Sequence, residues 1–250
     1  MDRRRVLRLL GLGGLLSLTG CDRLSQSRWF PRVLGKAEQF NHRLHHALAR
    51  RDSMAQEFTE ADLSPVFPSN GTRQPVDADY RLLAARNFAD WQLPVSGLVR
   101  NPRSYSLADL RALPSRTQIT RHDCVEGWSA IAKWRGARLA ALLDAVHPLP
   151  QARYVVFYCY DTMDFGGARY YESIDLEDAF HPQTILAYDW NDQPLPVPYG
   201  APLRLRVERQ LGYKMVKFLR GMELVESFDA IAGGNGGYWE DRGYEWYAGI

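Results

Sequence analysis

Residues 121–143 read "RHDCVEGWSAIAKWRGARLAALL" and join the end of an expected strand to an apolar-periodic helix. The preceding run "TQITRHDCV" has strand character, and "RGARLAALLDAV" (135–146) has apolar residues at helical spacing. Cys124 lies between them, one of only three cysteines in the 250-residue chain. This stretch therefore presents a lone thiol, between polar groups, at the end of a strand.

The setting of Cys124 favours a thiolate, because polar and cationic neighbours stabilise that form. A thiolate is a good ligand for a soft or high-valent metal. Two alternatives stay open: a disulfide with Cys159, and a Cys–His–acid hydrolase with His122 or His181 as base. Cys159 lies in the apolar run 152–161, where an inert buried thiol is the preferred interpretation.

The remaining pattern mixes strands and short helices without strict alternation, which predicts an α+β fold. Strands are expected where β-branched and aromatic residues gather, at 91–99, 117–125, 152–161, 201–212 and 216–227. Helices are expected at 106–113, with Ser106 as N-cap and Asp109 at N3, and at 135–146 and 173–180. Residues 184–197 read as a hairpin with the turn "NDQ", and the alternating apolar and basic residues of 201–212 predict one solvated face.

The first 21 residues have the layout of a secretory signal. "RRRVLR" resembles a twin-arginine signal through Arg3 and Arg4, and "LTGC" resembles a lipobox that would acylate Cys21. With Asp22 after it, this implies a periplasmic protein anchored by lipid in the inner membrane. Residues 22–78 are expected to form a tether with one amphipathic helix and a loop, and 79–250 the main domain. On that helix His42 and His46 are four residues apart, a spacing that can bind a metal or haem, but a solvated histidine face is the preferred interpretation. The role of the cluster His42, His45 and His46 stays open.

Several function classes find no support. A net charge of +2 without a basic stripe gives no reason to expect nucleic-acid binding. Nucleotide-binding loops, a G-x-S-x-G elbow and paired cysteines are missing from the sequence. No C-x-x-C-H motif for c-type haem occurs either.

The segment around Cys124 resembles the cofactor segment of the sulfite oxidase superfamily, molybdopterin-dependent oxidoreductases, and in particular its methionine sulfoxide reductase branch. The likeness runs from "ARNFADWQLPVSGLVRNP" through "YESIDLEDAFHPQTILAYDW" to "GAPLRLRVERQLGYKMVKF", so it covers roughly residues 79–250. It implies a sulfite-oxidase-like molybdopterin-binding fold, with one molybdenum and one molybdopterin per chain. Cys124 matches the thiolate that ligates the metal and is catalytic there.

The resemblance also implies a set of residues that contact the pterin cofactor. Arg204, Lys217 and the backbone of Met215 and Val216 match its basic and phosphate-contacting positions, and Asn87 matches a pterin-contacting asparagine. Two cofactor positions depart from the pattern: Tyr199 replaces an asparagine, and Cys159 replaces a threonine. The roles of His122, His181 and Asp161 stay open.

The activity implied is two-electron oxygen-atom transfer, with reduction of a sulfoxide such as methionine sulfoxide as the leading reaction. Oxidation of sulfite or another small sulfur compound is the alternative, and a non-catalytic pterin-binding lipoprotein or a metal-free thiol enzyme are readings of other classes. Since the chain has no haem or iron–sulfur motif, electrons would come through a partner, expected to be a membrane cytochrome of the b type.

Overall fold

The computed structural model describes residues 27, 29–30, 40, 44, 53–163 and 167–250. It contains two compact units, Met1–Ala49 and Arg50–Ile250. The expected signal, lipobox and histidine cluster lie outside the described residues. Within the part that is described, no helix is both long and apolar enough to cross a membrane.

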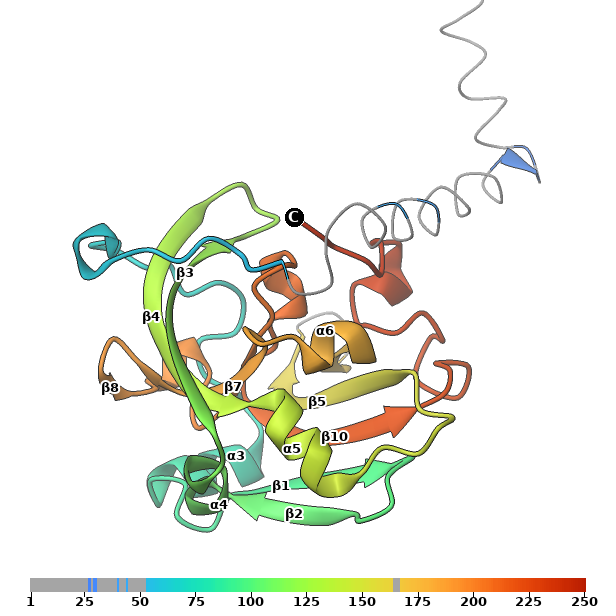
Figure 1. The fold of residues 1–250 in the computed structure, drawn as a ribbon, viewed down its shortest axis with the longest axis horizontal. Helices are drawn as coiled ribbons and strands as arrows, with labels where there is room; N and C mark the ends of the chain where they lie inside the picture. The colour runs from blue at the N-terminus through green and yellow to red at the C-terminus, as the bar shows by residue number, and fades with distance from the viewer. Residues whose placement is uncertain (1–26, 28, 31–39, 41–43, 45–52, 164–166) are drawn as a thin grey trace, which may run out of the picture. The chain divides into compact units, whose positions relative to one another are not determined.

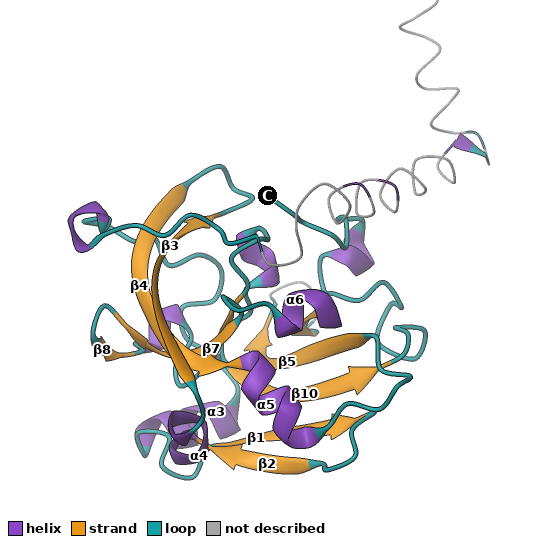
Figure 2. Ribbon diagram, in the orientation of Figure 1, coloured by secondary structure: helices purple, strands orange, loops and turns teal. Residues whose placement is uncertain are grey.

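Two five-stranded sheets form the larger unit, and helices are few and short (Figures 1 and 2). One sheet has the order β2-β1-β10-β5-β6, made of Arg103–Ser106, Gln92–Gly97, Leu219–Val225, Tyr154–Thr162 and Arg169–Asp175. The other has the order β3-β4-β7-β8 with β9 beside β7, made of Ser115–Asp123, Ser129–Arg138, Ile185–Trp190, Gln193–Pro194 and Arg204–Arg206. The pairing of β1 with β10 is parallel and the other ladders are antiparallel. This mixed architecture confirms the α+β prediction.

Local signals placed several elements correctly. Helix α4 (Leu107–Ala112) begins with the expected capping box, in which Ser106 and Asp109 bond each other's backbone N–H groups. Helices α5 (Leu139–Val146) and α6 (Leu176–Phe180) also form; α6 lies beside β5 and β6, and α5 lies beside α6 and β4 (Figure 1). Strand β4, however, extends through residue 138, so helix α5 begins four residues later than predicted.

The solvated face predicted for 201–212 is wrong. Arg204 and Arg206 are 2% and 0% exposed, and β9 covers only three residues. Both guanidinium groups stack over the ring of Trp134, at 4.9 and 4.5 Å from its centroid. Glu208 pairs with Arg206 at 2.5 Å, with both side chains fully buried. The burial of these arginines is therefore matched by the Trp134 ring from β4 and, for Arg206, by the nearby carboxylate of Glu208.

The loop before residue 78 is part of the domain. Phe67 is buried, and its ring contacts those of His122, Trp134 and Tyr199, among others. The Ile131 N–H donates to the Ser64 hydroxyl at 2.9 Å. The compact unit thus begins well before residue 79, the boundary expected from sequence. Helix α3 (Ala78–Ala85), which the sequence pattern did not reveal, follows this loop.

Candidate functional site

A cavity of about 200 Å³ lies where the end of β3, the end of β5 and the segment after η3 (Gly212–Lys214) meet. The loop 70–72 and two aromatic residues of the C-terminal segment complete its wall. The side chains and backbone that line it are those of Asn70, Gly71, Thr72, Cys124, Val125, Glu126, Asp161, Met163, Tyr170, Gly212, Tyr213, Met215, Val216, Lys217, Trp239 and Tyr244. Four of the residues predicted to contact the metal or the cofactor, Cys124, Met215, Val216 and Lys217, therefore line one cavity.

Cys124 occupies the first position of the tight turn between β3 and β4. Its N–H donates to the Trp128 carbonyl at 2.9 Å, and its own carbonyl accepts from the Gly127 N–H at 3.0 Å. Gly127 has φ +88, a left-handed conformation that suits glycine. The thiol is free and 7% exposed. This turn fixes the sulfur at the cavity wall.

The expected stabilisation of a Cys124 thiolate by its sequence neighbours is not what the structure has. Burial, the largest effect, raises the pKa of the Cys124 thiol. Arg121 is turned to Asp123, with Nε to Oδ1 at 2.9 Å, and the Asn70 amide lies 4.0 Å from the Cys124 sulfur. A bound metal deprotonates a coordinating thiol directly, so thiolate character here would come from a metal and not from the flanking charges.

His122 is buried near the end of β3, two residues before Cys124. Because Arg206 is always a donor, its Nη1 at 3.0 Å makes His122 Nδ1 an acceptor. His122 Nε2 then carries the hydrogen and has no partner among the described residues. Burial, and then the charges of Arg206 and Arg204, hold the pKa of His122 well below its ordinary value. The structure therefore does not support His122 as a general base for Cys124. The alternative of a disulfide is not supported either, since Cys124 and Cys159 are both free thiols.

Lys217 lines the cavity and, with Arg204 behind the cavity wall, gives this region positive charge. Lys217 Nζ donates to the carbonyls of Asn70 at 2.7 Å, Thr72 at 2.6 Å and Pro198 at 3.2 Å. Burial, followed by the charge of Arg204, lowers the pKa of Lys217 to about 7. Such depression marks a cation that a bound anion would stabilise.

Arg204 braces the cofactor-lining segment from behind the cavity wall. It donates from Nη2 to the Met215 carbonyl at 3.1 Å and from Nη1 to the Tyr199 carbonyl at 3.0 Å, while its Nε has no partner in the described part of the chain. Gly200, at φ +113, lies so close that an added Cβ would be 2.9 Å from Lys217 Cβ. Arg204 and Lys217 therefore depend on the same tight segment.

Besides Arg204, three residues predicted to contact the cofactor do not line this cavity. Asn87 is exposed in the turn after α3, with φ +50. Tyr199 stacks on Trp190, and its hydroxyl donates to the Phe67 carbonyl at 2.8 Å. Cys159 is fully buried on β5. Their assignment to the cofactor stays a prediction.

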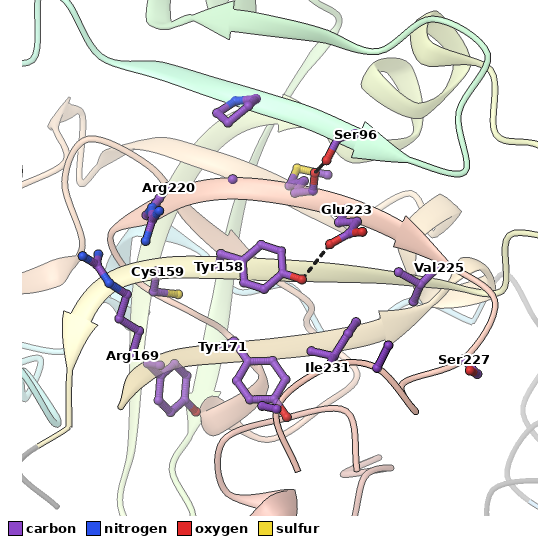
Figure 3. Close-up of a pocket in the computed structure, with 16 residues that line it drawn as sticks. Ser96, Tyr158, Cys159, Arg169, Tyr171, Arg220, Glu223, Val225, Ser227 and Ile231 are labelled. Atoms are coloured by element: carbon purple, nitrogen blue, oxygen red, sulfur yellow. Dashed lines mark hydrogen bonds between the residues drawn. The ribbon is translucent and has the colours of Figure 1, made fainter. Parts of the chain in front are cut away.

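A larger cavity, of about 680 Å³, lies on the face of β1, β10, β5 and β6. Figure 3 shows Arg169 and Arg220 at one end, with the Tyr158 hydroxyl donating to Glu223 at 2.7 Å. Arg169 is paired with Asp77 at 2.6 Å. Cys159 also lines this larger cavity, whereas Cys124, the predicted metal ligand, lines the smaller one.

His181 has a structural role at the end of α6. Its Nδ1 accepts from the Gln183 N–H at 3.2 Å, so its Nε2 carries the hydrogen and donates to the Ser53 carbonyl at 3.0 Å.

The loop 70–72 and Glu126 line the cavity but were not identified as site residues from the sequence. The only sequence signal in 70–72 was that of a turn, which does not indicate where the turn packs.

Comparison with known proteins defines the class. Residues 82–230 match the model of the oxidoreductase molybdopterin binding domain, and the chain belongs to this family. It is a molybdopterin-dependent oxidoreductase whose cofactor is molybdopterin with molybdenum.

The chain is similar to several named proteins of this kind. The chain is 38% identical over 242 residues to a putative protein-methionine-sulfoxide reductase subunit, YedZ1, of Azospira oryzae, covering 97% of this chain and 85% of that protein. It is 30% identical over 243 residues to the protein-methionine-sulfoxide reductase catalytic subunit MsrP of Xanthomonas campestris pv. campestris, covering 92% and 72%. The sulfane dehydrogenase SoxCD from Paracoccus pantotrophus shares the fold, with a TM-score of 0.50 and 21% identity, over 55% of this chain and 39% of that one. The predicted superfamily and fold are thereby confirmed.

The cavity fits this cofactor chemically. A pterin phosphate is an anion that Arg and Lys bind through charge-assisted hydrogen bonds, and Lys217 with the partly unpartnered Arg204 supplies that charge. Cys124 offers a sulfur ligand at the same cavity. The bound group supplies the redox chemistry, and the protein holds it and shapes access to it.

Proposed function

We propose that the enzyme reduces a sulfoxide by two-electron oxygen-atom transfer, with methionine sulfoxide in proteins as the leading substrate. The observation that carries this proposal is that Cys124 and Lys217 line the same cavity. The relatives that match most of this chain are named as protein-methionine-sulfoxide reductase subunits, which supports the same reaction. In this role Cys124 is the catalytic metal ligand, and Arg204, Met215, Val216 and Lys217 hold the pterin.

The rim of the cavity supports a substrate with an apolar sulfur group. Val125 and Tyr244 are 48% and 41% exposed and line the cavity, together with Met163 and Trp239. A methionine sulfoxide side chain carries methyl and methylene groups beside its polar oxygen. Thioether groups contact aromatic rings favourably, so Trp239 and Tyr244 suit the sulfide product as well.

Activity with reduced viologen tests the reaction. Protein isolated from a host with an intact molybdopterin pathway should oxidise reduced viologen when methionine sulfoxide is added, and Cys124→Ser should abolish turnover. Oxidation of sulfite without sulfoxide reduction would support the alternative, and bound pterin without any turnover would support a non-catalytic role.

We further propose that the protein works in the periplasm, held to the inner membrane by lipid on Cys21, and that a membrane cytochrome b delivers the electrons. The sequence of residues 1–22 supports export, and the reductase names of the relatives support a redox partner. Replacing Arg3 and Arg4 by Lys should leave the protein in the cytoplasmic fraction. Unchanged export of that variant would contradict the twin-arginine route, and release of a Cys21→Ala variant from membranes would support lipid anchoring.

A further inference from the structure

Asp161 is a buried acid in the cavity that also contains Cys124. It lies near the end of β5, whose side chains alternate so that Phe157, Cys159 and Asp161 are on the buried face. The Asp161 side chain is 5% exposed and lines the cavity. A carboxyl group is thereby held at the reaction site, away from bulk solvent.

One oxygen of the Asp161 carboxyl is left without a hydrogen bond from the described protein. Its Oδ1 has no hydrogen-bond partner among the described residues. Lys217, which also lines the cavity, directs its ammonium group to backbone carbonyls of Asn70 and Thr72. Buried polar atoms are nearly always satisfied in folded proteins, so an unpartnered oxygen at a cavity wall indicates a group that awaits a ligand.

The other titratable groups around Asp161 are already engaged or are poor proton donors. The Tyr80 hydroxyl, from α3, donates to the Ala201 carbonyl at 2.7 Å, and the Tyr170 hydroxyl, from β6, donates to the Tyr213 carbonyl at 2.7 Å. Burial, followed by the charge of Asp161, raises the pKa of both Tyr80 and Cys159, so both stay protonated. The other carboxylate that lines the cavity, Glu126, is exposed and accepts from Trp128 Nε1 at 3.1 Å.

Reduction of a sulfoxide consumes protons as well as electrons. Two electrons from the reductant and two protons convert the sulfoxide into a sulfide and water, with cleavage of the S–O bond. We propose that Asp161 is the catalytic acid that passes these protons, one at a time, from solvent to the departing oxygen. This inference rests on the proposed sulfoxide reductase function. Desolvation raises the pKa of Asp161 to about 6, against the opposing charge of Lys217, and an acid is most effective when its pKa lies near the working pH.

The first test needs no cofactor. Infrared difference titration of the cofactor-free full chain should show a buried carboxyl that titrates near pH 6. The signal should vanish in Asp161→Asn and persist in Asp144→Asn, which makes the same change on an exposed face of α5. Persistence of the signal in Asp161→Asn would overturn the assignment, whatever the enzyme's substrate is.

The second test uses the molybdenum-loaded enzyme and reads the pH profile. Because the acid must be protonated, wild-type kcat for sulfoxide reduction should fall as pH rises above about 6. Asp161→Asn should lower kcat by about 10²–10⁴-fold and remove this pH-dependent fall, at unchanged molybdenum content. Asp161→Glu, which keeps the carboxyl group, should restore part of the rate and the pH limb.

The outcomes separate the two proposals. A wild-type enzyme without sulfoxide reductase activity would refute the proposed function, but not the titration of Asp161. Wild-type turnover with an unchanged rate and pH profile in Asp161→Asn would refute the proton-transfer role alone. If Asp161→Asn loses molybdenum, the profile of Asp161→Glu decides: a displaced pH limb supports the role, and an unchanged limb contradicts it.

Discussion

Replacing Glu208 by glutamine should cost the domain about 3 kcal/mol of unfolding free energy, the low end of the range for breaking a buried ion pair. Glu208 Oε1 accepts from Arg206 Nε at 2.9 Å and from Gln118 Nε2 at 2.8 Å, and its Oε2 accepts from Arg206 Nη2 at 2.5 Å. Glutamine keeps one acceptor but turns an NH₂ group toward a guanidinium donor. The Arg206 charge would then be buried without compensation, beside the charge of Arg204.

Thermal and urea unfolding of the cofactor-free protein measure this loss. For a domain of about 200 residues, 3 kcal/mol corresponds to a fall in Tm of about 6–12 °C. The matched control is Asp90→Asn, which breaks the ion pair between Asp90 and Arg86. In that pair the Arg86 side chain is 71% exposed and the Asp90 side chain is 63% exposed. Exposed pairs contribute little, so the control should stay close to wild type.

A loss below about 1 kcal/mol in Glu208→Gln, no more than an exposed pair gives, would refute the claim that Arg206 depends on Glu208. Replacing both partners, as Arg206→Met with Glu208→Leu, should recover part of the stability, since an apolar pair needs no charge compensation.

Three further predictions concern the cofactor segment and a helix cap. In the cofactor-free protein burial lowers the pKa of Lys217 to about 7, against about 10.4 in the unfolded chain. Between these two pH values the unfolded chain binds more protons, so the free energy of unfolding should rise with pH. Urea titrations of Lys217→Met should not show this rise. Gly200→Ala should lower Tm and pterin content more than Gly71→Ala, because both have positive φ but only Gly200 is crowded by Lys217. Ser106→Ala should cost about 1 kcal/mol of unfolding free energy through loss of the capping box, measured by urea unfolding, and no loss would contradict the cap.

Local structure was predictable wherever the signal was local. The Ser106 capping box needs only residues 106–109, and the hairpin of 184–197 needs only its turn, where Asn191 and Asp192 adopt φ +48 and +61. Strand β4 was not predicted. Its last residues, "RGAR" (135–138), continue into the helical pattern of 139–146, and only the pairing of β4 with β3 and β7 identifies these residues as part of a strand.

The site was predictable to the extent that it follows motifs in one segment. Cys124 and the triplet ending at Lys217 could be located from sequence, and both line the cavity. The burial of Arg204 and Arg206 could not be foreseen, since it depends on Trp134 from a distant strand and on Glu208. The part played by loop 70–72 was hidden for the same reason: its carbonyls meet Lys217 only in the folded chain.

The claim that Cys124 binds the molybdenum is tested most directly by X-ray absorption at the molybdenum edge, on the loaded wild-type protein and on Cys124→Ser at equal pterin content. The wild-type spectrum should contain one more sulfur scatterer than that of the variant. Identical sulfur coordination in the two proteins would contradict the assignment of Cys124 as the metal ligand.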